Sequence, residues 1–252
     1  EEMNRSIFGP VCFNAAAPDD GNMFLLNRVA TEEQKAKWLQ PIIDGKVRSS
    51  IVMTEPAPGS GSDPAGMMQT TATKDGDNWV INGHKWFISG AKSAKFAILI
   101  ARTEDDPDIP QAGNTAFIID LPQEGWNDVR EVSTMHGSTG HSEIVIDNLR
   151  VPADAVLGGV GNGHLLGQSR LGPARLAHCM RWLGQAETAL EMMIDRATKR
   201  FAHGSLLSEK QGIQWMIADS SMELYQAKLM VLHAAYKIDR NEDFKSEVSM
   251  AK

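Results

Sequence analysis

The chain has 252 residues, of which 42% are hydrophobic and 23% are charged, and its formal net charge is -7. This composition is typical of an ordinary globular protein and excludes collagen-like, disulfide-scaffold and strongly disordered classes. Acidic residues outnumber basic ones, which argues against a partner recognised through a phosphate backbone, so we expect no nucleic acid as a partner. No apolar run reaches the roughly 18 residues of a membrane span, and the first residues lack the order of a signal peptide.

Two features bear on the compartment and on the extent of the chain. Cys12 and Cys179 are far apart and form no C-x-x-C or His-rich pattern, so the sequence predicts neither a disulfide framework nor a zinc site and favours a reducing compartment. The first residue is not methionine, and the last helical pattern reaches Lys252 without a cap. We therefore expect a piece of a longer protein.

Residues 1–46 are predicted to be mainly helical. Thr31 to Gln34 forms a capping-box pattern, and the stretch that follows to Leu39, closed by Pro41 and Gly45, predicts a short helix.

From Val47 the sequence changes to short β-like runs separated by Gly, Pro, Asn and Asp, which predicts an antiparallel sheet or barrel. Within it, Asn82-Gly83 separates two apolar runs, and Asn-Gly suits a type I′ turn because both central residues need a positive φ. We therefore expect a β-hairpin at Asn82-Gly83. The predicted strands cover Val47 to Thr54, Met68 to Lys74, Trp79 to Ser89, Phe96 to Thr103, Thr115 to Leu121 and Glu143 to Leu149.

The last part of the sequence predicts two long helices. Apolar residues recur at spacings of three and four, first from Leu176 to Ala197 and then from Ile213 to Ile238. Pro173 and His203-Gly204 bound the first stripe, and a second capping box, Ser208 to Gln211, opens the second one. Two antiparallel helices cannot bury both faces alone, so we expect them to form half of a bundle.

Generic catalytic signatures are mostly absent. The stretch from Gly59 to Pro64 has no Gly-Lys-Ser/Thr and no third glycine, so it is neither a Walker loop nor a G-x-G-x-x-G fingerprint. Its backbone N–H groups suit a phosphate or a polar ring edge, but the same composition also suits an ordinary turn. There is no H-E-x-x-H or G-x-S-x-G pattern, and His178 and His233 are interpreted as packing or surface residues on helices. We expect no metal site.

Four segments carry a resemblance to a known family. They are Met53 to Pro56 with Gly59 to Asp63, Val80 to Ala91, Glu143 to Pro152, and Leu171 to Arg181. Taken together, these segments resemble the signatures of the acyl-CoA dehydrogenases, and the last one is most similar to the branch of family members ten and eleven. The resemblance covers essentially the whole chain.

The resemblance implies an α+β multidomain fold in three parts. Residues 1–46 would be the remainder of an N-terminal helical domain, residues 47–156 a central antiparallel β-barrel or sheet domain, and residues 157–252 the first part of a C-terminal helical bundle. FAD is then expected between the β-domain and the bundle, with the bundle of a neighbouring subunit completing the site. The family also implies a homodimer or a homotetramer.

The resemblance further implies a set of FAD contacts. Two departures from the family pattern weaken part of the set: His203 stands where phenylalanine is usual, and the loop from Glu55 to Ser62 is about two residues longer than the commonest form. From the residues alone, the hydroxyls and aromatics of this set could be ordinary strand residues, and its arginine a solvated one near a helix end. The implied cofactor-binding residues are Met53, Thr54, Gly61, Ser62, Phe87, Ser89, Arg200 and Gln211.

The catalytic base is left unassigned. Some relatives have a glutamate before the arginine that matches Arg175, but this chain has Ala174, whose methyl group cannot accept a proton. We expect the base beyond Lys252, and we expect Arg175 to support the active-site geometry, although it could be only a helix-start arginine. This chain alone should then not catalyse dehydrogenation.

The implied function is FAD-dependent α,β-dehydrogenation of an acyl-CoA in fatty acid metabolism and β-oxidation, with an electron-transferring flavoprotein as acceptor. Three alternatives stay open: a non-catalytic FAD or acyl-CoA-binding protein of the same fold, an acyl-CoA oxidase, and a structural module without a cofactor. A bacterial cytoplasm and a mitochondrial matrix both fit the cysteine usage.

Overall fold

The computed structural model describes residues 1–65, 68–103, 113–135 and 137–252. The chain forms two compact units: the helical unit comprises Glu1–Ala15 and Gly172–Lys252, and the sheet unit comprises Ala16–Leu171. The helix α5 (Gly163–Lys199) begins in the sheet unit and continues in the helical unit. The division of the sequence into three family domains stays a prediction.

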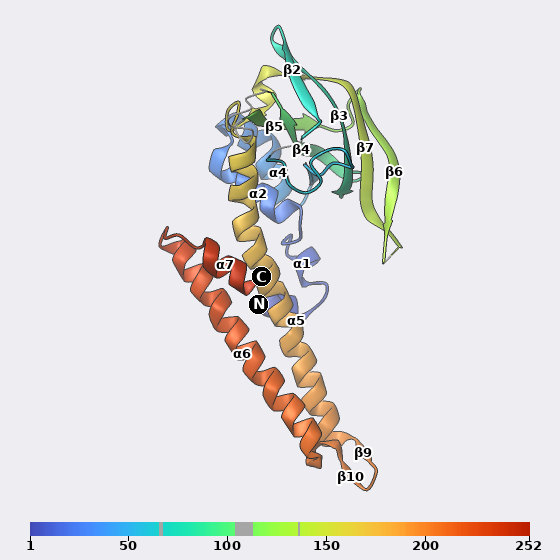
Figure 1. Ribbon diagram of the computed structural model, residues 1–252, viewed down its shortest axis with the longest axis vertical. Coiled ribbons are helices and arrows are strands. Elements are labelled where there is room, and N and C mark those ends of the chain that lie inside the picture. The colour runs from blue at the N-terminus through green and yellow to red at the C-terminus, as the bar shows by residue number, and fades with distance from the viewer. Residues whose placement is uncertain (66–67, 104–112, 136) are drawn as a thin grey trace. The chain divides into compact units, whose positions relative to one another are not determined.

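An eight-stranded sheet dominates the sheet unit, with β6 beyond β7 at one edge (Figure 1). Seven strands follow the order β6-β7-β3-β2-β4-β5-β8, and β1 pairs with β4 off this path. The strands are β1 (Arg48–Val52), β2 (Thr71–Asp75), β3 (Asn78–Ser89), β4 (Ala94–Arg102), β5 (Asn114–Asp120), β6 (Trp126–Thr134), β7 (Gly137–Pro152) and β8 (Val156–Leu157).

The predicted α+β fold is confirmed, with one difference in strand direction. Most neighbouring strands are antiparallel, but β1 and β2 both run parallel to β4, so the sheet is mixed. The strands β6 and β8 were not predicted. Most side chains of β6 are exposed and β8 has only two residues, so neither strand shows a clear buried alternation in its sequence.

The strand β4 separates the two hydrophobic clusters of the sheet unit. Phe96, Ile98 and Ile100 pack into a cluster with helix residues such as Leu25, whereas the alternate residue Leu99 and its neighbours pack into a cluster within the sheet. Because successive side chains point to opposite faces, a strand that is buried on both faces is a continuous apolar run. This arrangement explains why β4 shows no polar alternation.

The predicted hairpin at Asn82-Gly83 is wrong. Both residues lie inside the continuous strand β3, and neither has a positive φ. A Cβ atom on Gly83 would lie 2.3 Å from Thr70 Oγ1, so glycine is required there by a close approach and not by a turn. The true turn joins β2 to β3 at Gly76-Asp77, where Gly76 has a φ of +59°.

Short helices cover the sheet. The capping box predicted at Thr31 is confirmed, because Gln34 N donates to Thr31 Oγ1 and Thr31 N donates to Gln34 Oε1. The helical stretch continues past Leu39, through Pro41, which lies in a first helical turn where its missing N–H costs nothing. The helices are α2 (Asp19–Val29), α3 (Glu32–Gln34), the π-helical turn η2 (Lys35–Leu39), α4 (Gln40–Ile43) and η4 (Ala153–Ala155).

In the helical unit, α6 runs back beside α5, and a small hairpin joins them (Figure 1). Cys179, Leu183 and Val231 form the buried core between the two helices and the C-terminal helix α7. The other elements of this unit are η1 (Glu2–Arg5), α1 (Gly9–Cys12), β9 (Phe201–Ala202), β10 (Ser205–Leu206), η5 (Leu207–Glu209), α6 (Gln211–Asp239) and α7 (Lys245–Ala251).

Two predicted helix boundaries are wrong. Pro173 lies inside α5, which begins ten residues earlier at Gly163. The capping box at Ser208 does not form: α6 starts at Gln211 after Lys210, with no side-chain cap, and Ser208 lies in the short helix η5. The predicted end of the first helix is closer, because α5 ends at Lys199 and His203-Gly204 forms the turn between β9 and β10.

Candidate functional site

The candidate site begins where β1 ends. Thr54, just after β1, makes two hydrogen bonds with Trp86 of β3: Thr54 Oγ1 donates to the Trp86 carbonyl, and Trp86 N donates to the Thr54 carbonyl over 3.1 Å. The two segments are thereby fixed to each other although 32 residues separate them in sequence. Thr54 is thus placed by tertiary hydrogen bonds and not only by strand propensity.

A bulge in β3 turns an aromatic side chain outward. The pairing of β3 with β7 shifts register between Lys85 and Ile88, and Phe87 within this interval has a φ of +53°. Phe87 is 44% exposed and its ring packs edge-on against half-buried Trp86, with ring centroids 5.0 Å apart. A bulky residue in the left-handed region is strained, and such outliers concentrate at functional sites.

Ser89 lies two residues further along β3. Its carbonyl accepts a hydrogen bond of 2.8 Å from Ser50 Oγ of β1, and its own hydroxyl lies 2.9 Å from His141 Nδ1 of β7. Ser89 therefore connects three strands next to the bulge that carries Phe87.

The glycine loop, defined here as residues 53–65, folds back on itself beside this bulge. Glu55 N donates to the Gly61 carbonyl over 3.0 Å, and Gly59 N donates to the Pro56 carbonyl over 2.8 Å. Gly61 has a φ of +59°, and Ser62 after it is exposed. Met53 at the start of the loop is half-buried, so the loop has one end in the sheet and its tip in solvent.

Glu55 anchors the glycine loop from inside. Its carboxylate, only 1% exposed, accepts backbone hydrogen bonds from Ser60, Gln69 and Thr70 at 2.7–3.1 Å, and one from the Thr70 hydroxyl at 2.5 Å. A Cβ atom on Gly59 would lie 2.5 Å from Glu55 Oε2, so glycine is needed where the loop passes this carboxylate.

Lys85 neutralises the charge of Glu55. Lys85 is fully buried, and its Nζ lies 3.0 Å from both Glu55 Oε1 and the Met53 carbonyl. Burial raises the pKa of Glu55, but the Lys85 charge and the hydrogen bonds from Thr70 and Gln69 outweigh it and lower this pKa to about 2. Burial lowers the pKa of Lys85 to about 8, although the Glu55 charge acts in the opposite direction. The pair therefore joins the loop to β3 directly before the bulge.

From the sequence, Glu55 and Lys85 were named only within motifs, and Thr70 and His141 were not singled out. A signal was available for one of them: Lys85 lies at an inward position of a strand whose other inward residues are apolar, which is unusual for lysine unless it is paired. Thr70 and His141 are ordinary strand or loop residues, so only the tertiary structure identifies them.

The six predicted contacts of the sheet unit thus lie on three connected segments: the glycine loop, the bulge of β3 and its continuation to Ser89. The other three predicted residues belong to the helical unit. Arg200 follows α5 and Gln211 begins α6, and both are exposed at either end of the β9–β10 hairpin. Arg175 lies on α5, with its NH2 3.5 Å from Ser249 Oγ of α7.

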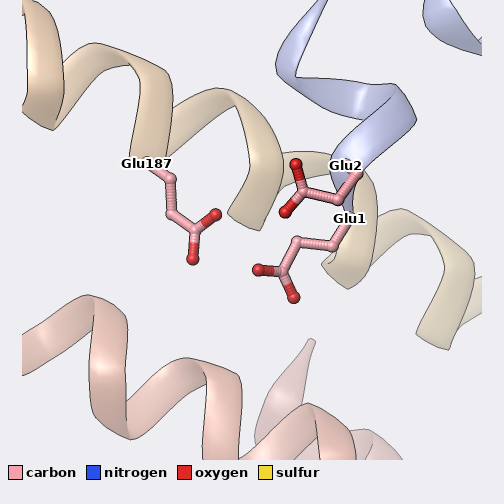
Figure 2. Close-up of side chains that lie close together, drawn as sticks. All are labelled: Glu1, Glu2 and Glu187. Carbon is pink, nitrogen blue, oxygen red and sulfur yellow. The ribbon is translucent and has the colours of Figure 1, made fainter.

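A cluster of acidic residues in the helical unit was not predicted. Among the residues that the structure describes, Glu1, Glu2 and Glu187 place one carboxylate oxygen each within 4.8 Å of one another (Figure 2). Two cations already contact these carboxylates: Lys228 Nζ lies 2.5 Å from Glu1 and 3.4 Å from Glu187, and Arg5 lies 3.5 Å from Glu187. The hydrogen bond from Lys228 lowers the pKa of Glu1. The cluster is an ion-pair network.

A surface cavity of about 550 Å³ lies elsewhere in the sheet unit. Its lining includes Trp38 and Gln34 of the helical stretch and Asp120 at the end of β5, and it contains none of the predicted cofactor contacts. Asp120 is already held by Lys37 Nζ at 2.6 Å and by the Trp38 indole at 2.8 Å.

Comparison with known protein families identifies the chain. The middle domain of acyl-CoA dehydrogenase matches residues 50–149, and the C-terminal domain of acyl-CoA dehydrogenase matches residues 161–252. The chain belongs to the acyl-CoA dehydrogenase family. In the part of the chain that the structure describes, no helix is long and apolar enough to cross a membrane.

Curated relatives and solved structures agree with this assignment. The chain is 40% identical to the probable acyl-CoA dehydrogenase FadE2 of Mycobacterium tuberculosis over 96% of this chain and 60% of the relative. It is 38% identical to acyl-CoA dehydrogenase family member 11 of Gallus gallus over 100% of this chain and 33% of the relative. The chain thus spans between one third and about three fifths of these two relatives.

The butyryl-CoA dehydrogenase of Megasphaera elsdenii superposes with a TM-score of 0.81 at 29% identity, over 91% of this chain and 59% of that one. A Mycobacterium abscessus structure described as an acyl-CoA dehydrogenase superposes with a TM-score of 0.87 at 38% identity, over 99% of this chain and 62% of that one. The PigA structure with FAD and proline superposes with a TM-score of 0.85 at 26% identity, over 96% of this chain and 61% of that one.

Proposed function

We propose that the intact protein is an FAD-dependent acyl-CoA dehydrogenase that converts an acyl-CoA thioester to a trans-2-enoyl-CoA. One observation carries the proposal: Thr54, Phe87 and Ser89, which family resemblance names as flavin contacts, lie around a single strained bulge of β3. Family membership and the PigA structure that contains FAD support the choice of cofactor.

The residues at the bulge fit the chemistry of a flavin, which combines a flat apolar ring with a polar edge. Phe87 offers an exposed aromatic side chain, and Ser89 offers a hydroxyl two residues away on the same strand. The glycine loop offers closely spaced backbone groups held in position by buried Glu55. Polar and apolar groups of the kind that a ring cofactor needs are therefore present in one connected region.

When bound, FAD supplies the acceptor for the hydride that leaves the β carbon of the substrate. Residues of this chain would hold the ring and exclude water: Phe87 would cover it, while Thr54 and Ser89 would contact its polar edge. Arg200 and Gln211 are proposed to contact FAD across a subunit interface, because a guanidinium suits a pyrophosphate. The residue that removes the α proton is not assigned, since Ala174 stands where some relatives have a glutamate.

The experiment that tests this proposal is a visible absorption spectrum of the purified full-length protein, followed by anaerobic addition of acyl-CoAs of several lengths. We expect a yellow protein whose flavin absorbance bleaches with one of them. The Phe87→Ala variant should bind FAD more weakly, whereas Phe24→Ala, which removes a side chain of similar exposure (39%) from α2, should bind it normally.

The other outcomes separate the alternatives. A yellow protein that no acyl-CoA bleaches would indicate either a lost base, as in a non-catalytic FAD-binding protein, or an acyl group outside the tested set. Rapid oxygen consumption with substrate would indicate an acyl-CoA oxidase. A colourless protein that FAD cannot restore would refute the proposal and indicate a structural module.

We also propose an electron-transferring flavoprotein as the electron acceptor and a homodimer or homotetramer as the assembly. One structural neighbour supports the first proposal, because its structure is described as the electron-transferring flavoprotein of Acidaminococcus fermentans. That neighbour is 29% identical to this chain and superposes with a TM-score of 0.80. Reduction of an added electron-transferring flavoprotein under anaerobic turnover would test the acceptor. Light scattering would test the assembly.

A further inference from the structure

The backbone of Ser89 is fixed from both sides. Ser50 Oγ of β1 donates to the Ser89 carbonyl over 2.8 Å, and Ser89 pairs with His141 in the antiparallel register of β3 and β7. The next residue, Gly90, donates its N–H to the Gly140 carbonyl over 2.8 Å. The main freedom left to Ser89 is therefore the rotation of its side chain and hydroxyl.

His141 removes that freedom. Its Nδ1 lies 2.9 Å from Ser89 Oγ, which is the normal length of a hydrogen bond. A serine hydroxyl has one proton and two lone pairs, so a bond to one ring nitrogen determines what the hydroxyl offers to a second partner. If Ser89 donates to His141, its lone pairs remain for the second partner; if it accepts from His141, its proton remains.

A second histidine on the same sheet makes a different kind of contact. His84 Nε2 of β3 lies 2.7 Å from Glu143 Oε1, and Arg130 Nε lies 2.6 Å from Glu143 Oε2. His84 thus bonds to a carboxylate that also pairs with Arg130. Burial raises the pKa of Glu143, but the hydrogen bonds from His84 and Arg130 outweigh it and lower this pKa. His141 instead contacts a neutral hydroxyl that already lies next to the strained bulge.

We infer that His141 is a positioning residue of the flavin site: it orients the Ser89 hydroxyl for the contact that Ser89 makes with the polar edge of the flavin ring. This inference rests on the proposed function, because it takes Ser89 as a flavin contact. His141 itself acts through Ser89 and makes no contact with the ring in this proposal.

A double-mutant cycle tests the inference in the full-length protein. The variants are Ser89→Ala, His141→Ala and the double variant, and the readouts are the dissociation constant for FAD and the absorption spectrum of the bound flavin. One neutral hydrogen bond corresponds to about a 2- to 10-fold change in affinity. We expect each single variant to weaken FAD binding within this range, and the double variant to match Ser89→Ala alone.

Two controls separate positioning from folding. The His84→Ala variant removes a histidine of the same sheet whose ring bonds to Glu143 and not to Ser89, so its affinity for FAD should equal that of the wild type. Thermal unfolding of each variant without FAD should give similar transition temperatures, which shows that lost affinity is not lost structure. If His141→Ala unfolds early, His141→Asn replaces it in the cycle.

The possible failures are distinguishable. If the wild-type protein does not bind FAD, the proposed function fails and the inference fails with it. If the wild type binds FAD but Ser89→Ala has the same affinity and spectrum, the inference is overturned while the proposed function stands. If the effects of Ser89→Ala and His141→Ala add in the double variant, His141 acts independently of Ser89 and the inference is again overturned.

Discussion

At the scale of single residues, the buried pair of Glu55 and Lys85 is the feature of the candidate site where we expect a single substitution to cost the most stability. Both side chains are almost fully removed from solvent. They pair with each other, and they also bind backbone groups of the glycine loop, Glu55 the Ser60 N–H and Lys85 the Met53 carbonyl. Such a pair adds little over a well-packed apolar pair, but removing one partner leaves an unpaired charge in the interior.

The Glu55→Gln variant should therefore be strongly destabilised, because the Lys85 ammonium loses its counter-charge in a buried position. We expect a loss of about 3–5 kcal/mol in the free energy of unfolding, measured by urea denaturation. The double variant Glu55→Gln with Lys85→Met should recover part of this loss. As a control, Asp195→Asn breaks an exposed ion pair with Lys199 and should change the free energy of unfolding little.

The pair of Glu55 and Lys85 also predicts that the free energy of unfolding depends on pH in the acidic range. The pKa of Glu55 is about 2 in the folded protein against an ordinary value of 4.5, so its contribution to stability is complete above pH 4.5 and is lost as the pH falls toward 2. The difference in free energy of unfolding between wild type and Glu55→Gln should shrink between neutral pH and pH values near 3. A difference that stays constant over this range would show that Glu55 titrates normally.

At the scale of secondary-structure elements, β3 shows why Asn-Gly did not make a turn. Gly83 is enclosed by β7 and by Thr70, whose side chain occupies the space that a Cβ atom would need. The preference of Asn-Gly for a type I′ turn is a local one, and pairing along two neighbouring strands overrides it.

This arrangement makes opposite predictions for two glycines. Gly83→Ala should destabilise the protein by about 1–3 kcal/mol, because the new methyl group overpacks against Thr70. Gly212→Ala lies in the first turn of α6, where no described atom beyond its own helical turn comes within 4 Å of the new Cβ. It should leave the stability unchanged or raise it by up to about 1 kcal/mol. Chemical denaturation of both variants tests these two predictions. Equal losses in the free energy of unfolding would contradict the packing argument.

The sequence predicted the elements better than their ends and partners. The apolar run of β4 and the stripes of α5 and α6 are strong periodic signals, and each element was found. Pro173 was taken as a helix start because proline is favoured in a first turn, whereas the apolar contacts of Leu166 extend α5 backward past it. Local preferences decide such boundaries only where packing does not.

In the candidate site, too, the sequence could predict some of the residues but not the contacts between them. Thr54, Phe87 and Ser89 could be named because they lie in segments that resemble a family. The pairing of Lys85 with Glu55 and of His141 with Ser89 could not be predicted, because each contact joins residues more than 29 positions apart in sequence. The inward position of Lys85 indicates a buried partner but does not say which residue it is. A single sequence shows which residues are present, and pairing across a sheet shows which of them meet.

At the scale of the whole molecule, the predicted FAD contacts are divided between two compact units. Six of them belong to the sheet unit, and Arg200 and Gln211 belong to the helical unit. A ligand that binds only the folded protein stabilises it by mass action, whichever residues make the contacts. Thermal stability therefore reports on FAD binding without any assumption about turnover or about the catalytic base.

We expect FAD to raise the unfolding temperature of the full-length protein stripped of cofactor. At an FAD concentration 100 times the dissociation constant, the stabilisation is about 2.7 kcal/mol, which corresponds to a shift of about 5–10 °C for a unit of roughly 150–250 residues and to a smaller one for a longer chain. Differential scanning calorimetry measures the shift, with ADP, which lacks the flavin ring, as the control ligand. The Phe87→Ala variant should show a smaller shift at the same FAD concentration, because it loses the exposed aromatic side chain at the bulge. An unfolding temperature that does not respond to FAD at any soluble concentration, in a protein that is folded at the start, would favour the structural module without a cofactor, since a protein that binds FAD in the native state cannot avoid this linkage.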